Sequence, residues 1–312
     1  MMIPSALTTL ILASLLQTNS CFSSLSRVLT RADVTMMSAV PIASTEDTST
    51  KLPSLLKCDR YVATNRFAVR KGKEAKFEQR WTTRKSRLSN LEGFKYFQLM
   101  RRVSLDGGIA DDESLGNYVS FTTWAEKKHF SSWRKGEAFK EAHGGTSIGA
   151  FVSTLVSSAL VLQGPPRPAF YDGILTLSSV PESVPDTQGG WRKVDANGKD
   201  LLPAECFVAC DQFCIPEESK VAFENLWSKK KECDGFVAFI MLRRDGSQKG
   251  HGIVPINESE PTYITTTIWR DRATFIAWQK NQSISDLPTQ FFKPPSPVFY
   301  EGVLVISHPE GL

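Results

Sequence analysis

The sequence predicts an α+β protein built from two tandem copies of one β-α-β-β-α-β unit. The first observation behind this prediction is an internal repeat. The block "YVATNRFAVRKGKEAKFEQRW" from Tyr61 matches "FVACDQFCIPEESKVAFENLW" from Phe207, and "PPRPAFYDGILTLS" from Pro165 matches "PPSPVFYEGVLVIS" from Pro294. The second observation is that strand-like alternation and helix-like spacing follow one another in the same order within each copy.

The elements of the first copy can be expected in order from these patterns. Residues 61–69 alternate in hydropathy and are rich in strand formers, whereas residues 71–88 place Phe77, Trp81 and Leu88 on one helical stripe. A second helix should carry a break at Gly136. The expected strands and helices cover residues 61–69, 71–88, 93–103, 117–124, 125–143 and 169–178. This is the order of the ferredoxin-like split unit.

The domain organisation follows from how such a unit buries its sheet. Two helices cover one face, and the other, apolar face must be buried elsewhere, so we expect the two copies to pack sheet to sheet within one chain. The first domain is predicted at residues 58–180 and the second, degenerate one at 204–308. The Pro-, Gly- and Ser-rich stretch at 181–203 is predicted to be a linker.

Residues 1–50 differ from the rest and predict a cleaved targeting leader. The apolar run Ser5–Gln17 has the length of a signal peptide and is too short to cross a bilayer comfortably. The Ser- and Arg-containing stretch after it has transit-peptide composition. Together they resemble the bipartite leader of proteins sent to complex plastids, and a plain secretory signal is the alternative. No other stretch is apolar enough for a membrane span.

Charge and cysteine usage exclude some classes of protein. The net charge of +4 is small and the basic residues are scattered, which disfavours a nucleic-acid surface. Cys206, Cys210 and Cys214 recur every four residues in a strand-like segment, which indicates a row of buried thiols on one face rather than a metal site. Such thiols suit a reducing compartment.

Three motifs of the first copy resemble a known family. They are "ATNRFAVRKG", "LEGF" and "WAEKKHFSSWRKGEAFKEAH". They are similar to the antibiotic biosynthesis monooxygenase superfamily, and within it to the Isd-type haem-degrading monooxygenases. The resemblance covers residues 60–180 in detail and the second copy in pattern only. It implies two dimeric α+β barrel domains that pack as a pseudo-dimer within one chain.

The resemblance also implies an active site. Asn65, Trp133 and His143 stand where the family has its Asn, Trp and His. The neutral imidazole of His143 would bind the haem iron as the proximal ligand. Asn65 would donate a hydrogen bond to dioxygen or to the porphyrin edge, and Trp133 would push the ring out of plane. Haem would serve as both cofactor and substrate.

The second copy differs at two of these positions. Asp211 replaces Asn65, Pro288 replaces His143, and only Trp278 is kept in place of Trp133. Since proline cannot bind iron, we expect one site per chain and a monomer in which the second copy completes the barrel. His129 has no counterpart in the motif and is expected to be a surface residue.

These observations lead to one main functional hypothesis and three alternatives. The main one is oxidative opening of haem with dioxygen and electrons from an external reductase, whose identity the sequence does not show, with release of iron. A haem-binding or trafficking protein would need His143 but not Asn65. A cofactor-free monooxygenase of a quinol or polycyclic aromatic would need the pocket but no iron ligand. A purely structural role is disfavoured because the first copy alone keeps all three residues.

Overall fold

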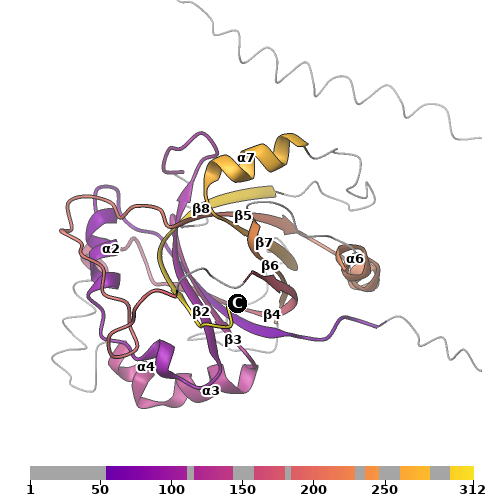
Figure 1. Ribbon diagram of the computed structural model, residues 1–312, viewed down its shortest axis with the longest axis horizontal. Coiled ribbons are helices and arrows are strands. Elements are labelled where there is room, and N and C mark those ends of the chain that lie inside the picture. The colour runs from indigo at the N-terminus through magenta and orange to yellow at the C-terminus, as the bar shows by residue number, and fades with distance from the viewer. Residues whose placement is uncertain are drawn as a thin grey trace, which may run out of the picture. The chain divides into compact units, whose positions relative to one another are not determined.

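Eight antiparallel strands of the described residues close into one barrel (Figure 1). The structure is a computed structural model that describes residues 54–110, 116–142, 158–179, 184–228, 236–245, 261–281 and 296–312. The strands are β1 (Arg60–Phe67), β2 (Phe94–Val103), β3 (Tyr118–Trp124), β4 (Arg167–Ser178), β5 (Cys206–Phe213), β6 (Phe236–Arg244), β7 (Tyr263–Trp269) and β8 (Ser296–Ser307). All four strands predicted in the first copy are confirmed. The predicted leader at residues 1–50 lies outside the described residues.

Helices cover the outside of the barrel and mostly follow the prediction. They are α2 (Glu74–Thr82), α3 (Lys127–Lys135), α4 (Glu137–Ala142), α6 (Lys220–Trp227) and α7 (Arg272–Asn281), with 3-10 turns η2 (Leu88–Asn90) and η3 (Glu217–Ser219). The predicted break at Gly136 separates α3 from α4, and the Gly136 N–H donates to the Trp133 carbonyl at 3.0 Å. The helix predicted over residues 71–88 is shorter than expected, since it ends at Thr82. Leu88 is buried as well, but it lies in the 3-10 turn η2.

The two halves of the chain join edge to edge. Strand order around the barrel is β1-β3-β2-β8-β5-β7-β6-β4, so β2 pairs with β8 and β4 pairs with β6. The expected sheet-to-sheet packing is therefore accompanied by hydrogen bonds between the sheet edges, which leave no open edge among the described strands. The apolar inner faces then share one core inside the barrel, which includes Val62, Phe121, Tyr171, Val208, Ile240 and Tyr300.

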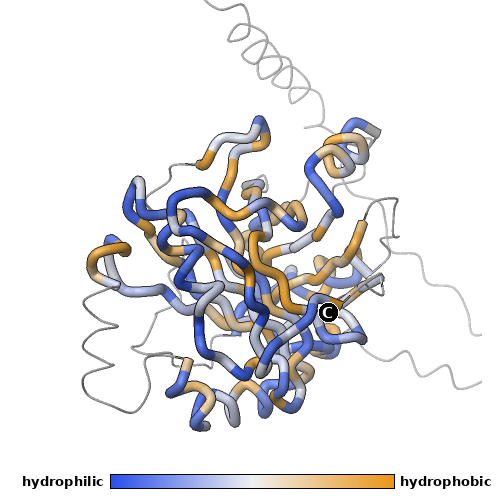
Figure 2. Tube along the Cα trace, turned by 60° about the vertical axis from the view of Figure 1, so that its left-hand side comes forward, coloured by the Kyte–Doolittle hydropathy of each residue, from blue (hydrophilic) through white to orange (hydrophobic). Residues whose placement is uncertain are grey.

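Outside the barrel, each helical layer packs on its own half of the sheet. In the first half, Phe77 of α2 and Phe130 of α3 pack on Tyr61 and Phe67 of β1. Apolar residues accordingly concentrate along the strands in Figure 2, with hydrophilic segments toward the periphery. This arrangement leaves the outer face of β1 between two helices, where the candidate site lies.

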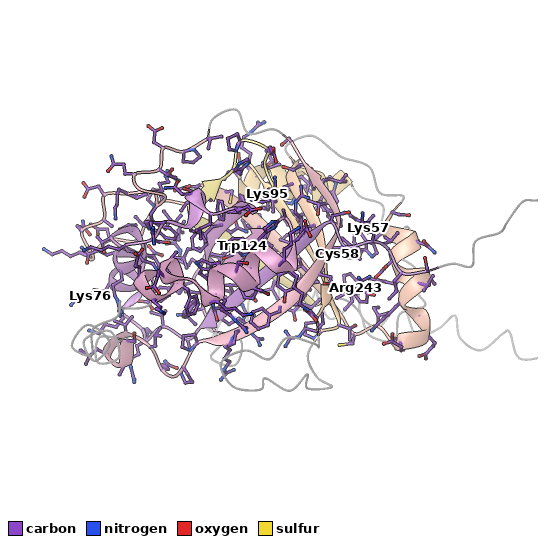
Figure 3. All side chains as sticks on the ribbon, turned by 90° about the horizontal axis from the view of Figure 1, so that it is seen from below. Lys57, Cys58, Lys76, Lys95, Trp124 and Arg243 are labelled. Atoms are coloured by element: carbon purple, nitrogen blue, oxygen red, sulfur yellow. The ribbon has the colours of Figure 1, made fainter. Side chains whose placement is uncertain are left out.

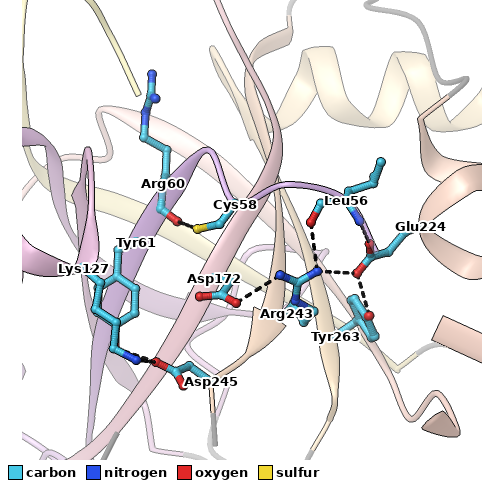
Figure 4. Close-up of polar contacts among 10 residues, drawn as sticks. All are labelled: Leu56, Cys58, Arg60, Tyr61, Lys127, Asp172, Glu224, Arg243, Asp245 and Tyr263. Carbon is cyan, nitrogen blue, oxygen red and sulfur yellow. Dashed lines mark hydrogen bonds and ion pairs between the residues drawn. The ribbon is translucent and has the colours of Figure 1, made fainter. Parts of the chain in front are cut away.

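Each half contains a buried ion cluster that binds a residue of the other half and the chain segment just before that other half. The cluster of the second half contacts the segment before β1. In Figure 4, Arg243 of β6 contacts Glu224 at 3.0 Å and Asp172 of β4 at 3.1 Å. Glu224 also accepts hydrogen bonds from the Tyr263 hydroxyl at 2.8 Å and the Leu56 N–H at 2.6 Å. Leu56 precedes β1, whereas Glu224 belongs to the second half. The N-terminal arm therefore fastens the two halves together.

The first half carries the matching cluster. Arg101 of β2 contacts Glu78 at 2.8 Å and Glu301 of β8 at 2.7 Å. Glu78 is fully buried and accepts from the Tyr118 hydroxyl at 2.7 Å and the Leu202 N–H at 2.6 Å. Leu202 precedes β5. The same set of residue types therefore recurs at both junctions of the barrel.

The connecting segment predicted as a linker is packed against the first half. Trp191 is buried, and its indole N–H donates to the Trp81 carbonyl at 2.9 Å. Its ring lies 5.0 Å from Phe97 and 6.4 Å from Trp81, measured between centroids. The segment at 181–203, which its composition predicts to be a linker, thus contributes Trp191 to the core of the first half.

Two of the three clustered cysteines line the barrel interior as predicted. Cys206 and Cys210 pack with the inner core, and burial raises the pKa of both thiols to about 12. Cys214 lies beyond the end of β5 and is only half-buried. Within the described residues no group of three or more His, Cys, Asp or Glu side chains is arranged to hold a metal ion.

Candidate functional site

Asn65 lies on the outer, helix-covered face of β1. Side chains alternate along a strand, and Ala63 and Phe67 on either side of it belong to the cluster under the helices, whereas Val62 faces the barrel interior. In the sheet register Asn65 stands opposite Ser120 of β3 and Pro168 of β4. The prediction that Asn65 sits on the first strand is confirmed, and its side chain is half-buried.

Asn65 has small neighbours on β3 and on one side of β1, and the larger Phe67 on the other side. Ala63, Ser120 and Thr122 adjoin it on β1 and β3, all less than a tenth exposed. Among the described residues the Asn65 side-chain amide makes no hydrogen bond. The two N–H donors of this amide can therefore form hydrogen bonds to a polar atom of a ligand that lies flat against the sheet.

Trp133 lies on α3 and packs into an aromatic cluster. Its ring centroid is 5.5 Å from that of Trp124, 5.8 Å from that of Phe130 and 5.1 Å from that of Phe139. Trp124, labelled in Figure 3, is fully buried as expected for a core residue. Trp133 itself is only partly buried. The cluster therefore fixes one side of the indole and leaves the rest open to the surface.

A pocket of about 330 Å³ opens beside Trp133. Gly136 and Ala138 line it from the junction of α3 and α4, and Arg87 and Leu91 line it from the segment after α2. Arg87 is held by a two-point contact with Glu141, at 2.9 and 3.0 Å. The pocket thus lies between the α3–α4 junction and the segment after α2, with the Trp133 indole as one wall.

His129 also lines this pocket, which corrects the expectation that it is a surface residue. Only 13% of its side chain is exposed, and its Nε2 lies 3.6 Å from a Glu92 carboxylate oxygen. Its ring rests on Gly93, where an added Cβ would come within 2.2 Å of it. Gly93 also has φ +75°, which favours glycine. The signal that could have revealed His129 is its spacing of four residues from Trp133 on one helix.

His143 lies outside the described residues. Helix α4 ends at Ala142, the residue before it. Helix α3 packs against β1 and β3. The structure therefore brings Asn65 and Trp133 to one helix-covered face of the first half, and the position of His143 relative to them stays a prediction.

The second half has the same aromatic packing at the corresponding place but a different polar residue on its first strand. Trp278 of α7 packs on Trp269 at 5.0 Å and Phe275 at 5.9 Å, as Trp133 does on Trp124 and Phe130. Asp211 stands opposite Thr265 in the sheet, as Asn65 stands opposite Ser120. Pro288 lies outside the described residues. The aromatic frame is thus common to both halves, and the neutral amide is particular to the first.

Comparisons with known proteins place the first half in a known family. Residues 60–145 match the family model "Antibiotic biosynthesis monooxygenase". A protein of Staphylococcus haemolyticus named "Heme oxygenase (staphylobilin-producing)" is 35% identical over 83 residues, which are 27% of this chain and 72% of that protein. A protein of the same name from Staphylococcus saprophyticus is 34% identical over 88 residues, or 28% and 76%.

A solved structure is also similar. It is a putative monooxygenase of Fusobacterium nucleatum with 10% identity and a TM-score of 0.49, and the match covers 80% of this chain and 95% of that one. The fold is a ferredoxin-like α+β barrel. The chain belongs to the antibiotic biosynthesis monooxygenase superfamily, and its Isd-type character rests on the two staphylococcal relatives.

Proposed function

We propose that this protein is a haem-degrading monooxygenase that binds haem through His143 and opens the porphyrin with dioxygen and external electrons, releasing iron. The observation that supports the proposal most directly is the shared location of Asn65 and Trp133. Both lie on the helix-covered face of the first half, within residues 60–145 that match the monooxygenase family model. The finer assignments below belong to the same proposal.

The residues of the first half fit a flat, largely apolar macrocycle with a polar centre. Small side chains lie beside Asn65 on the sheet, and the Trp133 indole forms a wall of the pocket between the α3–α4 junction and the segment after α2. When bound, haem supplies the redox chemistry and is itself the molecule that is oxidised. In this chain His143 would hold the iron, Asn65 would donate a hydrogen bond on the ligand face, and Trp133 would shape the ring.

The second half completes the barrel and does not bind haem in the same way. Asp211 offers a carboxylate where the first half has an amide, and Pro288 cannot act as a ligand. We infer that the two halves act as an intrachain pseudo-dimer, since each supplies four strands to one barrel. One site per chain and a monomer follow from this inference.

The leader and the electron supply complete the proposal. Residues 1–50 would direct the protein to a plastid, or alternatively into the secretory route, and an external reductase would provide electrons. Within the described residues, no helix combines the length and the apolar character needed to cross a bilayer.

A haemin titration of residues 51–312 tests the proposal. Wild type should bind one haemin with a sharp Soret band, and His143→Ala should weaken binding at least tenfold. His308→Ala is the matched control, because His308 is a half-exposed histidine of the second half and should leave binding unchanged. Equal binding by wild type and His143→Ala would contradict the proposed ligand. A bound haem that survives reductant and air unchanged would favour a haem carrier instead.

A further inference from the structure

A stripe of positive charge runs along α2 and into the turn after it. Lys73, Lys76, Arg80 and Arg84 follow one another at spacings of three, four and four residues. Such spacing places side chains on one face of a helix. Lys76 is at the rim of the molecule in Figure 3. From Lys73 to Arg84 the stripe would span about 16 Å at the helical rise of 1.5 Å per residue.

The internal repeat offers a comparison within the same fold. The positions that match Lys73, Lys76 and Arg80 on the second half are Ser219, Ala222 and Leu226, which carry no charge, whereas the position that matches Arg84 is the basic Lys230. Residues 70–87 hold eight basic and two acidic residues, whereas residues 216–233 hold four of each. Because both helices perform the same packing role, the fold does not require the positive stripe.

Two lysines of the stripe have no acidic partner within the described part of the chain, whereas Arg80 donates to the Ser158 hydroxyl at 3.4 Å. Lys73, Lys76 and the adjacent Lys85 are exposed and form no ion pair with an acidic residue of that part. Glu78, on the same helix, is fully buried and faces Arg101. A solvated helix face normally mixes both signs of charge, so a one-sign stripe points to an external anionic partner.

Arg84 strengthens the case because it is held rigidly by aromatic rings. Its guanidinium lies 4.7 Å from the Trp81 ring centroid and 6.0 Å from that of Trp191, with no carboxylate contact among the described residues. Burial lowers the pKa of Arg84 to about 10, so it stays charged at neutral pH. A stacked arginine loses little side-chain entropy when a partner binds, as at many protein interfaces.

The stripe also lies close to the candidate site. Trp81, beneath Arg84, is 5.8 Å from Phe67 between ring centroids. Phe67 is on the same face of β1 as Asn65, two residues further along. The Trp81 and Phe67 rings therefore lie between Arg84 and the face of β1 that carries Asn65.

We propose that the α2 stripe is the docking surface for an acidic electron-transfer protein. This inference rests on the proposed function, which requires electrons from outside the chain. In each encounter the partner loses one electron and the haem iron gains it, passing from the ferric to the ferrous state. A protein fits better than nucleic acid, because the stripe is one helix wide on a chain whose net charge is only +4.

The test measures binding of two probes to the haem-free protein. The probes are an acidic [2Fe–2S] ferredoxin and an acidic flavodoxin, each titrated at low and at near-physiological salt. The variant Lys73→Glu/Lys76→Glu should weaken binding of at least one probe about tenfold, mainly by slowing association. The control Arg270→Glu/Lys280→Glu makes the same change in charge on exposed residues of the second half and should change binding less than twofold.

Two further measurements complete the test. Haemin affinity should be the same in wild type and both variants, and thermal melting should show that all three fold. Absence of binding by both probes at low salt, equal weakening by the two variants, or tighter binding of a single-stranded RNA than of either probe would overturn the proposal. Failure of wild type to bind haemin would instead refute the proposed function, whatever the probes do.

Discussion

Replacing Arg101 by methionine tests whether the buried ion clusters hold the barrel closed. Arg101 is 7% exposed and its partner Glu78 is fully buried, with 2.8 Å between Nη1 and Oε1. The second guanidinium nitrogen contacts Glu301 of β8 at 2.7 Å. Burial lowers the pKa of Arg101, but Glu301 and Glu78 raise it more, so the arginine is charged in the folded state. Methionine keeps an apolar stem and removes the guanidinium charge together with its hydrogen bonds to Glu78, Glu301 and the Leu202 carbonyl.

The expected cost is large because Glu78 would be left as a buried, uncompensated carboxylate. Breaking one partner of such a pair costs about 3–5 kcal/mol. For a folded unit of this size, that should lower Tm by about 6–20 °C. Arg87→Met is the matched control. Its contact with Glu141 has similar distances, but the two side chains are 53% and 46% exposed, so removal should cost about 0–1 kcal/mol.

Urea and thermal unfolding of both variants, followed by circular dichroism, measure the difference. Glu78→Gln/Arg101→Met should recover part of the loss, since it removes the uncompensated charge as well. Arg243→Met in the matching cluster should also destabilise strongly. If Arg101→Met were within about 1 kcal/mol of Arg87→Met, the buried clusters would not be what fastens the two halves, and the reasoning would fail.

Two further predictions follow from the arm and the thiols. A chain that starts at residue 58 should be about 1–3 kcal/mol less stable than one that starts at residue 54, because it lacks the Leu56 N–H that Glu224 accepts at 2.6 Å; equal urea midpoints would contradict this. Iodoacetamide at pH 8 should modify exposed Cys58 well before Cys206 and Cys210, whose pKa values lie at about 12, as residue-resolved mass spectrometry would show. Reaction at similar rates would refute the buried placement of the two barrel thiols.

Much of the fold could be predicted because local patterns determine it. Alternation in residues 61–69 identified β1, and Gly136 marked the end of α3. The repeat then indicated that both copies share one architecture. The helical spacing of Phe77, Trp81 and Leu88 predicts a longer α2 than the structure has. Leu88 is buried like the other two, but it belongs to a 3-10 turn that follows the helix.

Other features could not be read from the sequence because they depend on distant contacts. Pairing of β2 with β8 and the packing of Trp191 on Trp81 both join residues more than a hundred positions apart. His129 was misjudged since only the fold brings Gly93 beneath its ring. For the candidate site, the motifs pointed to Asn65 and Trp133 as candidates, whereas the pocket between α3, α4 and the segment after α2 required the structure.

The most direct test of haem degradation is a single-turnover experiment on the haemin complex of residues 51–312. Ascorbate is added under air, and the Soret band and the iron released to a ferrous chelator are followed together. Wild type should lose the Soret band, gain a bilin-like absorbance and release one iron per chain, and Trp133→Ala should slow this strongly while Trp278→Ala does not. A Soret band that persists in wild type, with no iron released, would contradict the proposed activity.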